Sequence, residues 1–410
     1  MKYYLVAAIL TVGFGSTWIY EKIVYPLPDN GVLLSKKGNL MWYNRPGLVE
    51  NQNKLYAGWM TSDQKVVVGE ISKDTGHILE TIDLHQWRYL DDHGAPIIHA
   101  IEDGVHKDKL ISIYNLHNSE IYFQRSTNPN DITQWEKKMV INQCECTYPS
   151  ILEIDKILYL FYRKQIDSDS KTRSYFMKTS LDYGDSWGKE KEIIKAKTGE
   201  WIYAMVAKGS DSTLNIAWGV HDPVYGDIQN IFYAKSVDLG ASWKGIKSTE
   251  KSSFLRSQQE YLVRKSQFEK ATRLWDFRMD KNNNPVLLSV DYNKNDVDAY
   301  WMQYKNKEWI EIELGKNSRH YYPCGLVFKG DKYNHVYMTK DQSNNISTIY
   351  DIEIDSEAGS YRTVGNIINN SNFGYCRPMS SKTNDQLIYT AVRSYTNYMK
   401  FDTWLISNPF

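Results

Sequence analysis

The chain has little of what marks several common protein classes, and the first thing it lacks is net charge. Its 410 residues contain 49 Lys and Arg and 49 Asp and Glu, so the formal charges cancel. Binding along a nucleic acid requires a basic footprint, and a balanced chain gives no reason to expect one. The balance still allows a local basic cleft for an acidic substrate, because composition does not show how charges are distributed.

Cysteine is also scarce, being found only at Cys144, Cys146, Cys324 and Cys376. Cys144 and Cys146 lack a second Cys or His pair at the spacing of a zinc knuckle. In an oxidising compartment an even number of cysteines permits disulfides, and Cys324 and Cys376 lie in consecutive repeats, where they could face each other. Disulfides or buried thiols are therefore favoured over a metal site.

Helical periodicity is nearly absent, and the one weak stretch runs from Ser253 to Thr272. Residues that favour strands are abundant instead, with 31 Tyr and 13 Trp. Hydrophobic residues make up 42% of the chain, which is enough for a large core. We therefore expect an all-β protein, with the stretch from Ser253 to Thr272 as an insertion.

Long apolar runs are missing except at the N-terminus. Lys2 precedes an uncharged run from Tyr3 to Tyr20, which Glu21 and Lys22 close. This pattern predicts a signal peptide or an uncleaved membrane anchor over residues 1–22. No clear cleavage site decides between the two. Both predict a secreted, periplasmic or cell-surface protein whose only membrane contact is through this segment.

A short apolar strand recurs along the chain, and each copy is followed by a second strand with alternating pattern. Most copies start about 50 residues apart, as expected for a four-stranded blade with its loops. The pattern predicts a seven-bladed β-propeller over residues 35–410. The first strands are Lys54–Met60, Lys109–Asn115, Ile157–Arg163, Thr213–Gly219, Pro285–Tyr292, His335–Lys340 and Leu387–Val392, and their partners are Val66–Ser72, Glu120–Ser126, Ser174–Ser180, Asn230–Ser236, Ala299–Tyr304, Ser347–Ile352 and Phe401–Ser407.

Two repeats end in nearly identical turns, Ser180–Trp187 and Ser236–Trp243. In each, an Asp can accept hydrogen bonds from backbone amides, a Gly permits an unusual backbone angle, and a Trp can be buried between sheets. The turns resemble the Asp-box of sialidase-type propellers, and Ser126–Trp135 resembles a degenerate copy. The Asp-box is a structural motif, so it predicts a propeller and not a reaction.

Further motifs, spread over residues 40 to 405, resemble the BNR-4 repeat family in their type and order. They are Trp42–Pro46, Asp91–Pro96, Tyr114–Asn118, Arg125–Ser126 with Asp131–Trp135, Thr147–Pro149, Leu160–Arg163, Gly219–Pro223, Cys376–Pro378 and Tyr395–Tyr398. The resemblance again implies a seven-bladed propeller. Characterised relatives include ulvan-type polysaccharide lyases and enzymes that cleave rhamnose–glucuronate linkages.

The resemblance also implies a reaction and a set of site residues. The lyases cut an anionic polysaccharide beside a uronic acid by β-elimination and require no organic cofactor, and a structural calcium ion is compatible with the fold. Carried over by motif position, the catalytic candidates are His93, His117, Tyr148 and Arg163, and the substrate-binding candidates are Tyr203, His221 and Arg377. One departure is Gly94, because relatives often carry Asn after the histidine.

These residue types suit an elimination beside a carboxylate. Arg163 can clamp the carboxylate with two hydrogen bonds, which makes the neighbouring C–H proton more acidic. His93 or His117 can act as the base, because imidazole titrates near neutral pH. Tyr148 can protonate the leaving oxygen, or act as the base itself if a cation lies beside it. One residue could serve as both base and acid.

Three other functions stay open at this stage. A glycoside hydrolase usually needs two carboxylates across the bond, and Asp91, Asp92 and Asp222 do not form an evident pair. A propeller that only binds carbohydrate or protein is the second alternative. A sialidase is the least favoured, because the chain lacks a Phe-Arg-Ile-Pro segment.

Overall fold

The protein is an almost purely β structure. The computed structural model describes residues 27–409 except 249, 268, 295, 319–324, 344–345, 369–372 and 382–385. Within these residues there is no α-helix, and the only helical turns are the 3-10 turns η1 (Asp92–Gly94) and η2 (Gln259–Tyr261). The predicted signal or anchor over residues 1–22 lies outside the described residues. No helix in the described part of the chain is long and apolar enough to span a membrane.

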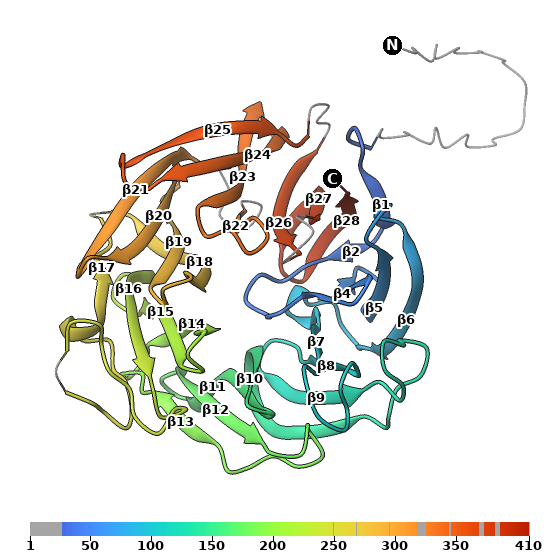
Figure 1. The fold of residues 1–410 in the computed structure, drawn as a ribbon, viewed down its shortest axis with the longest axis horizontal. Helices are drawn as coiled ribbons and strands as arrows, with labels where there is room; N and C mark the ends of the chain where they lie inside the picture. Colours follow the sequence, from blue (N-terminus) through green and yellow to red (C-terminus); the bar gives the residue numbers. More distant parts are fainter. Residues whose placement is uncertain are drawn as a thin grey trace, which may run out of the picture.

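The strands form sheets that stand around a central axis, as Figure 1 shows. Four of these sheets have four or five strands. Their strands are β2 (Gly38–Asn39), β3 (Leu48–Asn51), β4 (Lys54–Thr61), β5 (Lys65–Ser72) and β6 (Ile78–Gln86); β18 (Ala271–Met279), β19 (Pro285–Tyr292), β20 (Val297–Lys305) and β21 (Glu308–Lys316); β22 (Leu326–Phe328), β23 (His335–Ser343), β24 (Ile346–Asp355) and β25 (Ser360–Asn366); and β26 (Gly374–Ser380), β27 (Leu387–Asn397), β28 (Lys400–Asn408) and β1 (Val32–Ser35).

The remaining strands are joined into one continuous hydrogen-bonded sheet. Its strands are β7 (Ile97–Ala100), β8 (Leu110–Tyr114), β9 (Ser119–Arg125), β10 (Met139–Ile154), β11 (Ile157–Asp167), β12 (Thr172–Ser180), β13 (Lys191–Ile194), β14 (Trp201–Lys208), β15 (Leu214–Asp222), β16 (Asp227–Ser236) and β17 (Leu262–Arg264). The long strand β10 pairs with β9 through its first half and with β11 through its second half. A single parallel bridge, Arg173 to Trp201, joins β12 to β14.

Every strand pair predicted from the repeats is present as an antiparallel hairpin. The hairpins are β4–β5, β8–β9, β11–β12, β15–β16, β19–β20, β23–β24 and β27–β28. Strand β1 from the start of the described chain pairs with β28 from its end, so the two ends of the chain complete one sheet together. This pairing ties the first repeat to the last.

The two predicted Asp-box turns have the same hydrogen bonds. The backbone N–H groups of Ser186 and Ser242 each donate to the Oδ1 atom of the Asp four residues earlier, at 2.8 Å. Glycine follows each Asp by two residues and has a positive φ, 101° for Gly184 and 88° for Gly240. A side chain at either position would be strained, which explains the glycine in both turns.

The structure also bears on two other features of the sequence, the stretch from Ser253 to Thr272 and the cysteines. The stretch from Ser253 to Thr272, expected as an insertion, connects β16 to β18, and its described part contains η2, the short strand β17 and the first two residues of β18 but no α-helix. Its weak helical period reflects apolar residues such as Leu255 and Tyr261 that pack on the neighbouring sheet.

Cys144 and Cys146 form a disulfide, and Cys376 is a buried thiol. Its suggested partner Cys324 lies outside the described residues.

Large aromatic side chains fill the space between sheets. Trp59, Trp218, Trp243, Trp275 and Trp301 are all fully buried. Burial of such rings contributes about 25 cal/mol for each Å² of apolar surface removed from water. The abundance of Trp and Tyr in the sequence is therefore explained first by packing.

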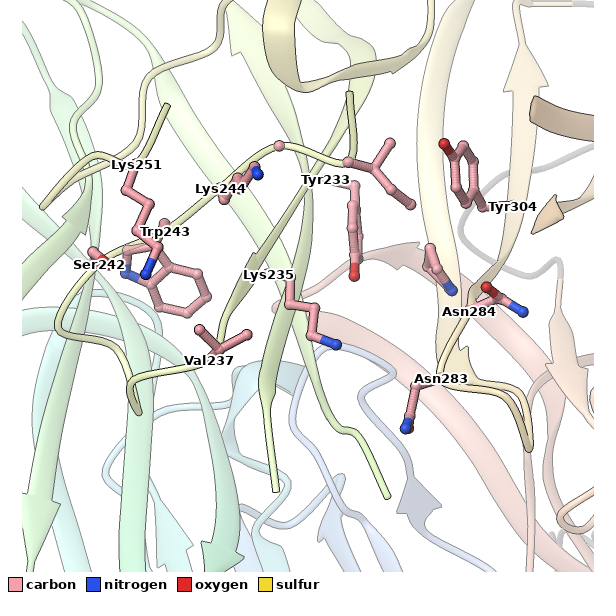
Figure 2. A pocket seen from close by; sticks show the side chains of 13 residues that line it. Tyr233, Lys235, Val237, Ser242, Trp243, Lys244, Lys251, Asn283, Asn284 and Tyr304 are labelled. Carbon is pink, nitrogen blue, oxygen red and sulfur yellow. The ribbon is translucent and has the colours of Figure 1, made fainter. Parts of the chain in front are cut away.

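One cavity lies between two neighbouring sheets. It has a volume of about 310 Å³ and is lined by residues of β16, of the segment that follows β16, and of the β18–β20 region (Figure 2). A second cavity lies beside β24 and β25. Neither is lined by any of the residues predicted to be functional.

Candidate active site

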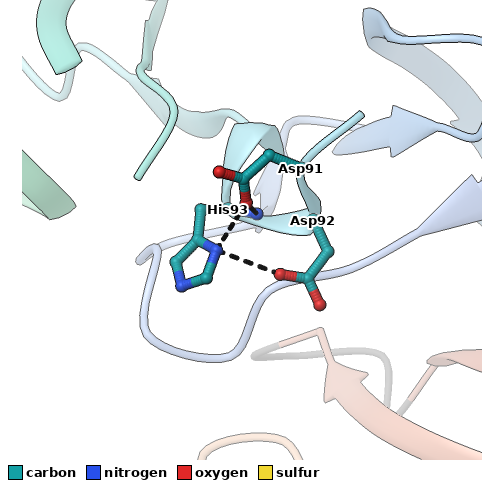
Figure 3. Close-up of side chains that lie close together, drawn as sticks. All are labelled: Asp91, Asp92 and His93. Carbon is teal, nitrogen blue, oxygen red and sulfur yellow. Dashed lines mark hydrogen bonds and ion pairs between the residues drawn. The ribbon is translucent and has the colours of Figure 1, made fainter. Parts of the chain in front are cut away.

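The centre of the candidate site is the short turn η1 between β6 and β7. Asp91 precedes the turn, and its Oδ1 atom accepts a hydrogen bond from the backbone N–H of His93 at 3.0 Å. The same Oδ1 atom lies 2.6 Å from Nδ1 of His93, and Oδ1 of Asp92 lies 3.1 Å from that nitrogen (Figure 3). All three side chains are buried. The turn thus holds one imidazole between two carboxylates.

The two carboxylates determine the protonation state of His93. Burial alone lowers the pKa of a histidine, but the charges and hydrogen bonds of Asp91 and Asp92 outweigh burial and raise the pKa of His93 to about 9. His93 is therefore an imidazolium at neutral pH. Both ring nitrogens then carry protons, and Nε2 donates to the hydroxyl oxygen of Tyr148 at 3.0 Å.

Asp92 is held in turn by Arg377, which is almost fully buried. The Nη2 atom of Arg377 donates to Oδ2 of Asp92 at 2.8 Å, and its Nη1 donates to the carbonyl of Leu40 at 2.7 Å. Tyr395 donates to the same Asp92 oxygen at 2.6 Å. Although burial opposes ionisation, Arg377 and these hydrogen bonds lower the pKa of Asp92 to about 2. Arg377 therefore positions the carboxylate that holds His93, which differs from the substrate contact expected for it.

Tyr148 reaches His93 because the backbone of β10 is irregular at this point. The register of β10 against β11 shifts between Thr147 and Ser150, and Tyr148 has a φ of 58°. A bulge of this kind redirects a side chain, and a bulky residue with positive φ stores strain of about 1–3 kcal/mol. Such strain is concentrated at functional sites. The bulge directs Tyr148 towards the histidine.

His117 and Arg163 complete the group of predicted catalytic residues. The rings of His117 and His93 are 4.7 Å apart, and the Nη2 atom of Arg163 lies 3.3 Å from Nε2 of His117. Burial, followed by the positive charges of His93 and Arg163, lowers the pKa of His117 to about 2. His117 is therefore neutral, with Nε2 as the unprotonated nitrogen that faces the guanidinium. The structure thus places a protonated and a neutral imidazole side by side.

Three arginines converge on the other side of the site, around Tyr203. The guanidinium of Arg163 lies 4.6 Å from the ring centre of Tyr203 and 4.7 Å from that of Tyr148. Arg273 lies 5.9 Å from the same Tyr203 ring. Burial raises the pKa of Tyr203, but the charges of Arg163 and Arg273 outweigh it and hold that pKa below its ordinary value. Burial and the charge of Arg163 lower the pKa of Arg173 to about 10.

Carboxylates do not balance these arginines. Among the described residues, no ion pair joins Arg163 or Arg173 to a carboxylate, and Arg273 has Asp227 at 3.9 Å. The Nε and Nη1 atoms of Arg163 have no hydrogen-bond partner in this part of the chain, although the residue is only 1% exposed. Buried charged groups are normally paired. This imbalance indicates a site prepared for an anion.

The remaining predicted residue, His221, lies at the edge of the arginine group. Its ring stacks on Trp201 at 4.2 Å, and Arg173 lies 4.2 Å from the ring centre of that Trp. His117, Tyr203, Trp201 and His221 are partly exposed. They form the side of the site that faces solvent.

The structure therefore brings together His93, His117, Tyr148, Arg163 and Tyr203, places His221 beside them, and gives Arg377 a supporting position. Sequence reasoning missed Arg173, Arg273 and Trp201. The two arginines stand inside mostly buried strands, Thr172–Ser180 and Ala271–Met279. A charge in a buried strand is the signal that could have identified them.

Asp91, Asp92 and His93 are the one group in the described residues whose atoms lie close enough together to ligate a metal ion. The group does not fit that role, because Asp92 is already bound by Arg377 and Tyr395, and both oxygens of Asp91 accept backbone N–H groups, those of His93 and His117. A structural calcium ion elsewhere stays a prediction.

The fold is similar to that of solved structures of polysaccharide lyases. The chain resembles an ulvan lyase of polysaccharide lyase family PL25, solved bound to -[GlcA(1-4)Rha3S]-, with a TM-score of 0.74 and 12% identity over 91% of this chain and 94% of that one. It also resembles the polysaccharide lyase Uly1, with a TM-score of 0.60 and 14% identity over 89% and 90% of the two chains. No curated protein sequence matches the chain. The BNR repeat-containing family, BNR_4, matches residues 54–317, more than half of the sequence, and the chain belongs to this family.

Proposed function

We propose that this protein is a polysaccharide lyase that cleaves a uronate-containing anionic polysaccharide by β-elimination. The observation that carries the proposal is the buried guanidinium of Arg163, which has no carboxylate partner among the described residues and stands beside His117 and Tyr148. A uronate carboxylate would supply the missing negative charge through two hydrogen bonds. The ulvan lyases of similar fold act on polymers of this kind, which supports the same substrate class here.

In this proposal, Arg163 binds the carboxylate of the uronic acid and stabilises the charge that develops when C5 loses its proton. His117 is the neutral imidazole of the pair and accepts that proton at Nε2. Because Nη2 of Arg163 faces this nitrogen at 3.3 Å, the guanidinium must turn from Nε2 to the bound carboxylate before the proton is transferred. A bound carboxylate also favours protonation of His117, since an opposite charge nearby stabilises the imidazolium. The electron pair of the C5–H bond forms the C4=C5 double bond.

The C4–O bond breaks in the same reaction, and the leaving oxygen needs a proton. We assign that proton to the hydroxyl of Tyr148. The imidazolium of His93 donates to the Tyr148 oxygen at 3.0 Å and so stabilises the negative charge that develops on it. In this proposal His93 therefore supports the acid, and His117, the other candidate base from the sequence, removes the proton.

A hydrolase of the usual kind is less well supported. Asp91 and Asp92 both hold His93, and Asp92 is also paired with Arg377. Asp222 ends β15, where its Oδ1 atom accepts the backbone N–H of Val224. None of the three candidate carboxylates is therefore placed as one of a pair across a bond.

The proposal includes a propeller of seven blades with Asp-boxes. The continuous sheet divides at β10, which contributes to two blades, and at the single Arg173–Trp201 bridge into three groups of about four strands. Together with the other four sheets these groups give seven blades. We also propose export of the protein, on the basis of residues 1–22, and an extracellular polymer is the kind of substrate that export would reach.

A panel of uronate polymers tests the proposed function. One polymer should yield new reducing ends together with the ultraviolet absorbance of an unsaturated uronate. The variant His93→Gln serves as the control and should yield neither. Reducing ends without absorbance would indicate a hydrolase. Binding to a polymer with neither signal would indicate a propeller that only binds carbohydrate.

A further inference from the structure

The cavity shown in Figure 2 lies at the opposite end of its sheet from the candidate site. On β15, His221 stands beside the site and pairs with Ile228, whereas Asn215 pairs with Lys235 of the cavity. These β15 positions are 221 − 215 = 6 residues apart, which corresponds to roughly 20 Å along a strand. The cavity is therefore a separate place in the molecule.

The charges that line this cavity are all positive. Its 13 lining residues include Lys235, Lys244 and Lys251 and no Asp or Glu. Lys235 forms an ion pair with Asp211 at 2.9 Å, and the charge of Lys251 contributes to the lowered pKa of Asp238 outside the cavity lining. Lys244 and Lys251 are exposed. A cavity of this composition attracts an anion.

The lysines are held in place by the backbone of the loop that follows β16. Antiparallel bridges join Lys235 to Lys244 and Trp243 to Ser252. Trp243 is 1% exposed and anchors this loop to the sheet. Lys244 and Lys251 therefore project from two neighbouring, backbone-paired segments (Figure 2). A site on a fixed backbone needs less ordering when a ligand binds.

The opposite wall of the cavity carries amide and phenol groups. Asn283 accepts two hydrogen bonds from Ser210 through Oδ1, at 2.7 and 2.9 Å, so its amide nitrogen is the group that can donate to a ligand. Asn284 donates to Asp280 at 3.0 Å, which leaves its oxygen as an acceptor for a hydroxyl group. Tyr304 is partly exposed and adds an aromatic ring.

We propose that this cavity is a second binding site for an acidic saccharide, which holds a polymer chain on the face of the propeller opposite the candidate active site. Lysines would bind carboxylate or sulfate groups, amides would bind hydroxyl groups, and the ring of Tyr304 would pack against a sugar face. A volume of about 310 Å³ falls within the range of ligand sites and accommodates a short saccharide segment. That this polymer is also the substrate rests on the proposed function.

The test is affinity electrophoresis of the full chain in gels that contain a polymer of glucuronic acid and 3-sulfated rhamnose. All proteins carry His93→Gln, so that the polymer stays intact during the run. The test variant adds Lys244→Glu and Lys251→Glu. The control variant adds Lys107→Glu and Lys137→Glu, two exposed lysines elsewhere, so that both variants have the same net charge.

The test variant should bind about tenfold more weakly, because lysine contacts to anionic groups on a polymer dominate its affinity, and the control variant should change less than twofold. In the protein with native His93, the KM for the polymer should rise more than the KM for a short oligosaccharide. Equal weakening in both variants, or no weakening in the test variant, overturns the second site. If no polymer is cut but the test variant still loses binding, the second site stands and the proposed function fails.

Discussion

The candidate site has an acidic side, around Asp91 and Asp92, and an arginine side, around Arg163. The two sides differ in whether their charges are balanced. On the acidic side, His93 and Arg377 are matched by Asp91 and Asp92, and every charge has a partner within hydrogen-bond distance. On the arginine side, Arg163 has no carboxylate partner among the described residues. The acidic side keeps His93 protonated in the unliganded protein. The proposed substrate would supply the negative charge that the arginine side lacks.

Under the proposed function, this difference separates residues that maintain the site from residues that would bind the substrate. Substitutions on the balanced side should affect both stability and turnover, since they leave a buried charge unpaired. Substitutions on the arginine side should affect turnover while the free protein keeps or gains stability. The predictions that follow test this separation.

The largest effect is expected for His93→Ala. Loss of a group that supports proton transfer lowers turnover by about 10²–10⁴-fold. A matched control is His99→Ala, because His99 is also buried and bound to a carboxylate, with Nε2 2.9 Å from Glu153, but lies outside the site. The control should lower the melting temperature and leave kcat close to its original value. Equal losses of turnover in both variants would remove the special role of His93.

The next effect concerns stability. Asp92→Asn leaves Arg377 buried without its carboxylate and should lower the free energy of unfolding by about 3–5 kcal/mol in denaturant titration. The double variant Asp92→Asn with Arg377→Met removes both charges and should recover part of the loss. No recovery in the double variant would show that the charge pair is not the cause.

On the arginine side, Arg163→Met should lower kcat/KM for a uronate polymer. The fall should correspond to about 1.5–3 kcal/mol of lost transition-state stabilisation, which is the contribution of hydrogen bonds to a charged group. The free energy of unfolding should be unchanged or higher, because an uncompensated buried charge is replaced by an apolar side chain. A large loss of stability would contradict the distinction between the two sides.

The last prediction is a pH dependence of stability. The pKa of His93 rises from its ordinary value of 6.5 to about 9, so its stabilising contribution is complete below pH 6.5 and is lost as the pH rises through 9. His117 has a lowered pKa, so it reduces the stability of the folded protein as the pH falls below 6.5. The difference in unfolding free energy between the original protein and His93→Gln isolates the His93 contribution, and it should shrink between pH 6.5 and pH 9. A constant difference would contradict the raised pKa.

Much of the fold could be predicted from the sequence because blade strands alternate and recur at a regular spacing. The hairpins from Lys54–Ser72 to Leu387–Ser407 were found in this way. The weak helical period from Ser253 to Thr272 does not correspond to a helix, because a few apolar contacts in an irregular loop can mimic such a period. The sequence also gave no sign that Cys144 and Cys146 would join each other.

The candidate site was predicted less completely. His93, His117, Tyr148 and Arg163 were identified by motif position, and the structure places them in contact. Arg377 was expected to bind substrate, but its role depends on a partner, Asp92, that lies 285 positions away in the sequence. Pairings over such distances depend on how the sheets meet around the axis, and a linear pattern does not contain that information. Arg173 and Arg273 each carry a signal, a charge in a buried strand, but the sequence does not show that their two strands meet at one site.

The central claim is that a substrate carboxylate completes the charge balance of the arginine side. The most direct test compares a uronate polymer with the same polymer after its carboxyl groups have been reduced to alcohols, under identical conditions. We expect unsaturated uronate to accumulate from the first polymer, with no chain cleavage in the second. Cleavage of the reduced polymer at a similar rate would contradict the account.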